Sequence, residues 1–328
     1  MMKLKIPWWL LATVFLATAP VSEAQQPKQI PRIGLLFSVS ASSAADRVEA
    51  FRQGLRELGY VEGSNILLEY RYAESKLDRL PALAADLVHL KVDVIVTSNQ
   101  EPTRSAKAAT VTIPIVMARD TDLVGNGFVA SLARPAGNIT GLSSMAPDIS
   151  GKHVELLKEI VPRLSRLAVL GTSNTPGNAH LIREIETAAG AFGVTPQYLD
   201  VLTVKDIEPA FRAAGKGRAE AILVLGSGIY ASDRKKVVEL TVKNRLPAIF
   251  RSREYMEVGG LMAYGVNPFA LDRRAATYVD KILKGAKPAE LPVEQPTRFE
   301  FIVNLKAAQQ IGLTIPPNVL ARADRVIK

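Results

Sequence analysis

The three histidines are the first residues to test for catalysis or metal binding. His89, His153 and His180 are separated by 64 and 27 residues, and none belongs to an H-E-x-x-H motif or another paired metal-ligand spacing. The chain has no cysteine, so thiolate ligands and thiol nucleophiles are excluded. The run LGSG at 225–228 places a serine between glycines but lacks the five-residue pattern of a nucleophile elbow. We therefore expect no catalytic set and no metal site.

A dinucleotide cofactor is also not expected. Gly125, Gly127 and Ala130 fit the alanine form of the dinucleotide fingerprint. However, Asp120 and Asp122 precede them, and their charge would repel a pyrophosphate. The chain contains no Walker-type phosphate loop, so we expect no cofactor at all.

Binding chemistry is indicated instead by polar residues that follow apolar runs. Ile113–Val116 reads as a short buried strand, and Arg119 and Asp120 follow it closely. In an open parallel sheet, ligands bind beyond the carboxyl ends of the strands, so charges of both signs at this position predict a recognition site. A solvated loop is the alternative.

The first half of the chain alternates predicted strands with predicted helices, which implies a parallel sheet. The predicted strands are Arg32–Ser38, Asn65–Tyr72, Val92–Thr97, Ile113–Val116 and Ile139–Ser144. The predicted helices begin at Asp46, span Leu77–Leu90 and lie near Val124–Leu132.

The second half repeats this pattern after a predicted helix at Ser150–Ile160. Arg166–Thr172, Ala219–Gly226 and Leu246–Ile249 match three strands of the first half in position and chemistry. Further predicted elements are a helix at Leu271–Leu283, a strand at Phe299–Val303 and a short helix at Leu305–Ile311. Two similar α/β halves should thus present their strand ends to a common cleft.

We expect a small polar or zwitterionic ligand to bind in this cleft. The residues predicted to contact it are Ser38, Ser40, Ser98, Asn99, Gln100, Arg119 and Asp120 in the first half, and Asn174, Ser227, Tyr230, Arg251, Glu254 and Tyr264 in the second. Arginine and hydroxyl groups suit a carboxylate, whereas Asp120 or Glu254 suits an ammonium group. Tyr230 or Tyr264 is placed to stack on a planar side chain.

The composition excludes several other classes of protein. The chain has 328 residues, of which 48% are hydrophobic, so it can bury a large core and disorder is not expected. Its formal net charge is +9, but the basic residues are scattered rather than clustered. Binding to nucleic acid is therefore not expected.

Residues 1–24 have the pattern of a cleavable signal peptide. Lys3 and Lys5 form a positive start, an apolar run from Trp8 to Leu16 follows, and Ser22 and Ala24 supply small residues before Gln25. No later run approaches the roughly 20 apolar residues of a membrane span. We expect a soluble protein that is exported to the periplasm or another extracytoplasmic space.

Three stretches of the chain resemble a known family. They are GFVASLARPAGNITGLS at 127–143, RLPAIFRSREYMEVGGLMAYG at 245–265 and AELPVEQPTRFEFIVNLK at 289–306. With them, essentially all of residues 31–328 is similar to substrate-binding proteins of ABC transporters, of the tryptophan/tyrosine type. The chain departs from the usual motifs of this family at Asn99–Glu101, at Asp122–Gly125 and at Ala263–Val266. These departures lie in the expected cleft and leave the identity of the ligand open.

The resemblance implies a two-lobed α/β fold of the first periplasmic-binding class, with Rossmann-like lobes joined by a multi-stranded hinge. The first lobe should comprise residues 31–144 and about 268–290, and the second 145–267 and about 291–328. The implied partners are a small-molecule ligand and a membrane permease with its ATPase, and the protein should be a monomer. Two alternatives remain: an exported ligand-sensing module for a membrane receptor, and an exported enzyme. The enzyme would be favoured if Asp120 or Glu254 lay buried beside a substrate with a strongly perturbed pKa.

The predicted signal peptide can be tested by intact-mass measurement of protein recovered from the periplasm. We expect cleavage after Ala24, so the recovered mass should be that of a chain beginning at Gln25. A full-length chain in the cytoplasm would contradict both the export and the transport function.

Overall fold

A computed structural model describes residues 30–144, 149–174 and 178–328. The chain divides into two compact units, Met1–Ile30 and Pro31–Lys328, and the second holds every helix and strand given below. The predicted signal peptide, residues 1–24, lies outside the described residues. None of the described helices is both long enough and apolar enough to cross a bilayer.

The unit Pro31–Lys328 contains two β-sheets, and all strands of the first sheet are parallel. In sheet order, its described strands are β2 (Leu67–Tyr72), β1 (Arg32–Phe37), β3 (Val94–Thr97), β4 (Ile115–Asp120) and β5 (Ile139–Ser143). The central strands are mostly apolar and buried, as expected for a parallel sheet covered on both faces. Their carboxyl ends therefore lie along one edge.

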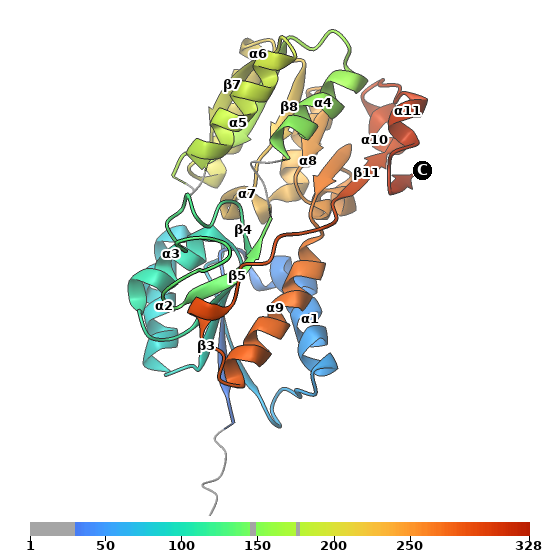
Figure 1. Cartoon of the computed structure of the whole chain (residues 1–328). Helices are drawn as coiled ribbons and strands as arrows, with labels where there is room; N and C mark the ends of the chain where they lie inside the picture. The colour runs from blue at the N-terminus through green and yellow to red at the C-terminus, as the bar shows by residue number, and fades with distance from the viewer. Residues whose placement is uncertain (1–29, 145–148, 175–177) are drawn as a thin grey trace, which may run out of the picture. The chain divides into compact units, whose positions relative to one another are not determined.

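Helices cover both faces of the first sheet (Figure 1). One face carries α1 (Ala41–Glu57) and α9 (Pro268–Leu283); the other carries α2 (Leu80–His89), with the short η1 (Leu77–Arg79) before it, and α3 (Gln100–Ala109). Phe51 of α1 and Val279 of α9 belong to the same buried cluster. A helix from late in the chain thus completes the layer that α1 begins.

The second sheet is mixed, with one antiparallel pair formed by β10 and β11 among its described strands. In sheet order, these strands are β12 (Arg325–Ile327), β11 (Glu300–Asn304), β10 (Met262–Gly265), β9 (Ala248–Phe250), β8 (Ala221–Val224), β6 (Arg166–Gly171) and β7 (Thr195–Asp200). The strands β6 to β10 pair in parallel, so their carboxyl ends also share an edge.

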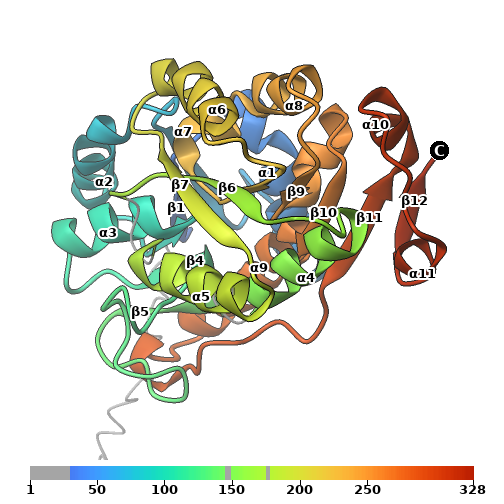
Figure 2. The same ribbon diagram turned by 90° about the horizontal axis from the view of Figure 1, so that it is seen from above.

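Helices also pack on both faces of the second sheet (Figure 2). One face is covered by α4 (Ser150–Ile160), α5 (Asn178–Ala191), α10 (Leu305–Gln310) and α11 (Pro317–Leu320), and the other by α6 (Ile207–Lys216) and α8 (Arg234–Lys243). The remaining short elements are η2 (Val204–Asp206), α7 (Gly228–Ala231), η3 (Arg253–Val258) and η4 (Pro288–Glu290).

In the order of described elements, the chain changes sheet three times: between β5 and α4, between β10 and α9, and between η4 and β11. The third passage runs beside β5, because Glu294 N donates to Gly141 O at 3.0 Å and Ser143 N donates to Glu294 O at 2.9 Å. Asn267, at the end of the second passage, donates through Nδ2 to Glu300 Oε1 at 2.8 Å. Hydrogen bonds therefore connect the third passage both to β5 and to the second passage.

The fold class predicted from the sequence is confirmed: the chain has two α/β sheets, mostly parallel. The predicted helix Ser150–Ile160 coincides with α4, and the predicted strand Arg32–Ser38 contains β1. Both were recognisable because each is a strongly apolar or strongly amphipathic segment with a clear stop.

Two helix predictions in the first half are wrong. α1 begins at Ala41 rather than Asp46, because Ser40 caps it by accepting a hydrogen bond from Ser43 N. The helix predicted near Val124–Leu132 is replaced by turns. There the Asp122 side chain accepts a hydrogen bond from Gly125 N at 2.8 Å, which favours a turn over a helix.

In addition, the helix α3 before β4 was not predicted.

The close packing of α1 against α9 can be tested at Gly54. A Cβ atom at this position would lie 2.3 Å from the carbonyl oxygen of Arg273 and 2.9 Å from the Ala276 Cβ in α9. Gly54→Ala should therefore lower the free energy of unfolding by about 1–3 kcal/mol, measured by urea denaturation. Gly215→Ala in α6 is the matched control, because its Cβ would meet nothing within 4 Å. Equal stability of Gly54→Ala and the wild type would contradict the packing.

Candidate functional site

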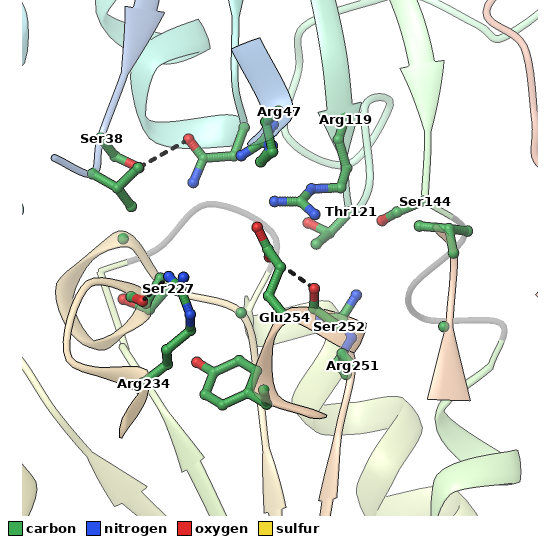
Figure 3. Close-up of a pocket in the computed structure, with 18 of the residues that line it drawn as sticks. Ser38, Arg47, Arg119, Thr121, Ser144, Ser227, Arg234, Arg251, Ser252 and Glu254 are labelled. Carbon is green, nitrogen blue, oxygen red and sulfur yellow. Dashed lines mark hydrogen bonds between the residues drawn. The ribbon is translucent and has the colours of Figure 1, made fainter. Parts of the chain in front are cut away.

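A cavity of about 100 Å³ lies where the carboxyl ends of the two sheets face each other (Figure 3). The first sheet and its helices contribute Ser38, Val39, Ser43, Arg47, Asn99, Gln100, Arg119, Thr121 and Ser144. The second sheet and its helices contribute Ile149, Gly226, Ser227, Gly228, Ala231, Arg234, Arg251, Ser252, Glu254, Tyr255 and Gly265, and the passage after β10 adds Val266. Since about 10–15 Å³ of such space holds one water, the cavity can accept a ligand of several non-hydrogen atoms.

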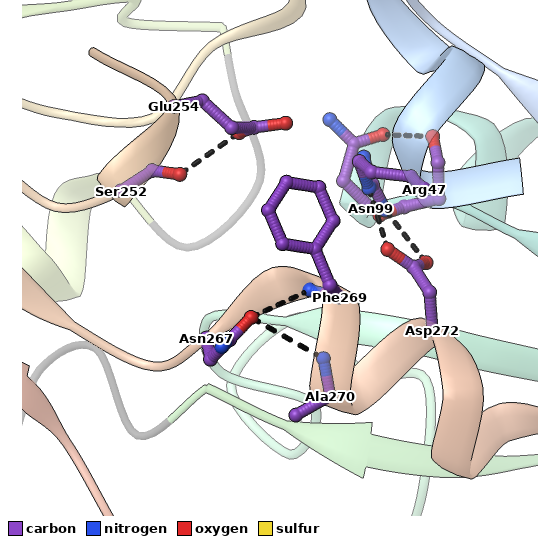
Figure 4. A network of polar contacts seen from close by, with 9 residues as sticks. Arg47, Asn99, Ser252, Glu254, Asn267, Phe269, Ala270 and Asp272 are labelled. Atoms are coloured by element: carbon purple, nitrogen blue, oxygen red, sulfur yellow. Dashed lines mark hydrogen bonds and ion pairs between the residues drawn. The ribbon is translucent and has the colours of Figure 1, made fainter. Parts of the chain in front are cut away.

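The first wall of the cavity is ordered by a buried ion pair behind it (Figure 4). Arg47 Nε and Nη2 donate to the two carboxylate oxygens of Asp272 at 2.7 and 3.0 Å. Arg47 Nη2 also donates to the carbonyl oxygen of Ser98 at 3.1 Å. Asp272 therefore neutralises Arg47 and fixes it against the end of β3.

Asn99 and Ser38 stand next to each other on this wall. Ser38 Oγ donates to Asn99 Oδ1 at 3.4 Å, and Ser98 Oγ donates to the same oxygen at 3.2 Å. The amide nitrogen of Asn99 makes no hydrogen bond within the described part of the chain. It can therefore donate to a ligand.

Arg119 supplies a positive charge from the end of β4. It makes no hydrogen bond or ion pair with any described residue. Burial and the neighbouring Arg47 lower the pKa of its guanidinium, although Glu254 opposes this effect. A guanidinium remains charged at physiological pH, so Arg119 is a cation directed at the cavity without a bonded partner among the described side chains.

Glu254 supplies a negative charge from the second wall. Its carboxylate accepts a hydrogen bond from Ser252 Oγ at 2.8 Å. Burial alone would raise its pKa, but the charges of Arg119, Arg47 and Arg234 and the Ser252 hydrogen bond outweigh burial and lower it. Glu254 is therefore ionised, yet it forms no ion pair with a described cation. Opposite charges thus face each other across the cavity without contact.

Of the residues predicted from the sequence, seven line the cavity: Ser38, Asn99, Gln100, Arg119, Ser227, Arg251 and Glu254. Six of these residues follow the carboxyl ends of strands, and Arg119 is the next-to-last residue of β4. Ser227 is held by its neighbours, since its Oγ accepts hydrogen bonds from Thr172 Oγ1 at 2.9 Å and from Ile229 N at 3.1 Å.

Asp120 does not line the cavity, although Arg119 beside it does. β4 continues to Asp120, and successive side chains of a strand point to opposite faces. The Asp120 side chain is fully buried, and its Oδ1 accepts hydrogen bonds from Asp122 N at 2.8 Å and Asn126 Nδ2 at 2.9 Å. Burial raises its pKa to about 7. Because this carboxyl group lies outside the cavity, its shifted pKa does not favour an enzyme.

Four other predicted residues lie outside the cavity lining: Ser40, Ser98, Asn174 and Tyr264. Ser40 caps α1, and Ser98 is buried with its carbonyl oxygen bound to Arg47. Asn174 is exposed. The Tyr264 ring is stacked on Phe299 at 5.9 Å. The side chain of Tyr230, the remaining predicted residue, lies outside the described atoms.

The sequence prediction missed several polar cavity residues. They are Ser43, Arg47, Thr121, Ser144, Arg234 and Ser252. Ser252 lies between Arg251 and Glu254, so the strand-end rule could have included it. Arg47 and Arg234 lie on helices, and no local signal in the sequence shows which helix face meets the opposite sheet.

The described residues contain no group of three or more His, Asp or Glu side chains placed to hold a metal ion. The described lining of the cavity includes none of the three histidines. His153 Nε2 lies 2.7 Å from the carbonyl oxygen of Tyr264, and burial lowers its pKa to about 3. His180 Nδ1 lies 2.7 Å from Asp122 Oδ2. The cavity thus offers groups that can bind a zwitterion, namely arginines, hydroxyls, an amide and a carboxylate.

The sequence of this chain matches the model of one protein family. The family described as ABC transporter substrate binding protein matches residues 32–327. A tyrosine-binding protein of Clostridioides difficile (strain R20291) is 24% identical to this chain over 277 residues, which is 84% of this chain and 79% of that protein.

Two solved structures are similar over most of the chain. One is a conserved domain protein of Vibrio cholerae O1 biovar eltor, with a TM-score of 0.86 and 28% identity over 90% of this chain and 99% of that chain. The other is an ABC domain of Streptococcus pneumonia in complex with L-Trp, with a TM-score of 0.84 and the same identity of 28%, over 90% of this chain and 99% of that chain.

The raised pKa of Asp120 predicts a pH dependence of stability. Its pKa of about 7 lies above the ordinary value near 4, so between these values the folded state binds more protons than the unfolded state. Through this group, stability should therefore fall as the pH rises from about 5 to about 8. Asp120→Asn should abolish this contribution, and its stability relative to the wild type should rise by on the order of 2–4 kcal/mol across the range. Parallel thermal-unfolding profiles of the two proteins would contradict the assignment.

Proposed function

This chain belongs to the family of ABC transporter substrate-binding proteins, and we propose that it captures an amino acid or a related small polar solute between two lobes and delivers it to a membrane permease. In this proposal the first lobe comprises residues 31–144 and about 268–290, and the second comprises 145–267 and about 291–328. The observation that carries it is the cavity whose unpaired opposite charges, Arg119 and Glu254, come from different sheets.

Arg119 and Glu254 suit the two charges that every amino acid carries. An α-carboxylate can accept hydrogen bonds from Arg119, and an α-ammonium group can donate to Glu254. Thr121 Oγ1 is buried without a hydrogen-bond partner among the described residues and offers a further group to the ligand. Each hydrogen bond to a charged group contributes about 1.5–3 kcal/mol, so these contacts suffice for selective binding. The relatives that are named for tyrosine or bound to L-Trp support the amino-acid class.

The ligand should favour the closed arrangement of the lobes, because it contacts both of them. Other contacts between the two lobes accompany this arrangement. Ser75 Oγ donates to Ser232 Oγ at 2.7 Å, and His180 lies 2.7 Å from Asp122. None of these four residues belongs to the cavity lining. They therefore support closure without fixing which solute is bound.

The proposed site of action is the periplasm or another extracytoplasmic space, which is where the predicted signal peptide would deliver the protein. We expect a monomer that binds its solute without altering it, since no cavity residue of the described chain has the arrangement of a nucleophile with its base. Solute recovered chemically unchanged after long incubation with the pure protein would support this function.

Closure can be tested at Gly228, where the two lobes approach closely. A Cβ atom at Gly228 would lie 2.6 Å from Ser38 Oγ and 2.7 Å from Ser38 Cβ on the opposite lobe. Gly228→Ala should therefore impede closure and weaken solute binding by about ten-fold or more, which corresponds to at least about 1.4 kcal/mol. X-ray scattering should show a smaller radius of gyration for the wild type with solute, and a reduced change for Gly228→Ala.

Gly190→Ala in α5 is the matched control, because its Cβ would meet nothing within 4 Å. This variant should bind and close like the wild type. A wild-type radius of gyration that is unchanged at saturating solute would contradict capture between the lobes. Unimpaired binding by Gly228→Ala would contradict the close approach in the bound state.

A further inference from the structure

The cavity carries more positive charge than a neutral amino acid can balance, and we infer that the solute is an acidic amino acid, with Arg234 binding its second carboxylate. This inference rests on the proposed function, in which Arg119 binds the α-carboxylate and Glu254 the ammonium group. It names the class of solute as amino dicarboxylic acids, and it assigns a specificity-determining role to Arg234.

The charges of the cavity lining favour an anionic solute. Arg47 is neutralised by Asp272. The other arginines of the described lining, Arg119, Arg234 and Arg251, share one lining carboxylate, Glu254. A neutral zwitterion would leave this excess of positive charge unchanged in a closed cleft, whereas a solute with a net charge of −1 reduces it.

The guanidinium of Arg234 has N–H donors that no described group uses. Its Nε is buried and makes no hydrogen bond with any described group, and its Nη1 makes one long bond of 3.4 Å to the carbonyl oxygen of Ala231. Figure 3 shows its side chain extending from α8 toward Ser227, on the second wall of the cavity. A carboxylate that accepts two hydrogen bonds from this guanidinium would satisfy the donors that the described chain leaves unused.

The positions of the two arginines separate the two anionic subsites. Figure 3 shows Arg119 on the first wall opposite Glu254, and Arg234 on the second wall near Ser227. Arg119 is therefore the better partner for an α-carboxylate, which lies next to the ammonium group held by Glu254. Arg234 is left for a group farther along the side chain of the solute.

The apolar lining does not favour an aromatic solute. Among the described side chains, Tyr255 is the aromatic residue of the cavity, and its ring is already stacked on Phe250 at 4.5 Å. The Tyr264 ring is packed against Phe299 and Phe301 instead of facing the cavity. An indole or phenol ring would thus lack an open aromatic surface on which to stack within the described lining.

The inference can be tested with pairs of solutes that have the same shape and differ in charge. Titration calorimetry on the full mature protein should compare L-glutamate with L-glutamine, L-aspartate with L-asparagine, and both pairs with L-tryptophan and L-tyrosine. One of the two acids, glutamate or aspartate, should bind more tightly than the other. We expect that acid to bind at least ten-fold more tightly than its own amide, because only the acid forms a hydrogen-bonded charge pair with Arg234.

Two variants separate this inference from the proposed function. Arg234→Gln should reduce the preference for the acid over its amide to about one, while binding of the amide changes little. Arg119→Gln should weaken both members of a pair, because both have the α-carboxylate. Lys235→Gln is the matched control, since it removes one charge from the same helix turn at a side chain that is 78% exposed.

Each outcome decides between the two proposals. Equal or tighter binding of the amides or of the aromatic amino acids would overturn the inference and leave the proposed function intact. An acid preference that survives Arg234→Gln would overturn the role of Arg234. Binding of no member of the panel would overturn the inference alone, because the proposed function also includes related small polar solutes. Loss of the preference in Lys235→Gln would show that long-range charge, and not the Arg234 subsite, selects the solute.

Discussion

The buried ion pair between Arg47 and Asp272 is the interaction on which the arrangement of the first sheet and its helices depends. Both side chains are only 6% exposed, so removal of either partner would leave an unbalanced charge in the interior, at a cost of about 3–5 kcal/mol. Arg47 also holds the Ser98 carbonyl oxygen, which precedes Asn99 in the cavity wall. One guanidinium thereby connects α1, the returning helix α9 and the end of β3.

Much of the fold was predictable because its strands are short apolar runs between polar loops. Arg166–Thr172 and Val92–Thr97 were predicted in this way, and both contain an observed strand. The prediction failed where local hydrogen bonds override the apolar pattern, as in the turn at Gly125. It also missed α3, whose apolar residues are a proline in the first turn and alanines, so that no stripe of large apolar side chains marks the helix.

The site was less predictable than the fold because a binding site depends on the direction of each side chain. Arg119 and Asp120 are adjacent in sequence but face opposite sides of β4, since the strand extends farther than its apolar residues suggest. Tyr264 belongs to a strand as well, and its ring takes part in an aromatic cluster beside the sheet. Arg234 comes from a helix, and only the three-dimensional arrangement of the two sheets and their helices shows that it reaches the cavity.

The three connections between the sheets determine which motions the lobes can make. Backbone hydrogen bonds join the third passage to β5, and the Asn267–Glu300 hydrogen bond joins it to the second. Connections that are bonded laterally resist sliding and twisting, which would break those bonds, whereas bending across them leaves the bonds intact. Under the proposed function, bending across these connections is therefore the motion that would close the two lobes. A permease would then meet two defined shapes, open and closed, rather than a continuum.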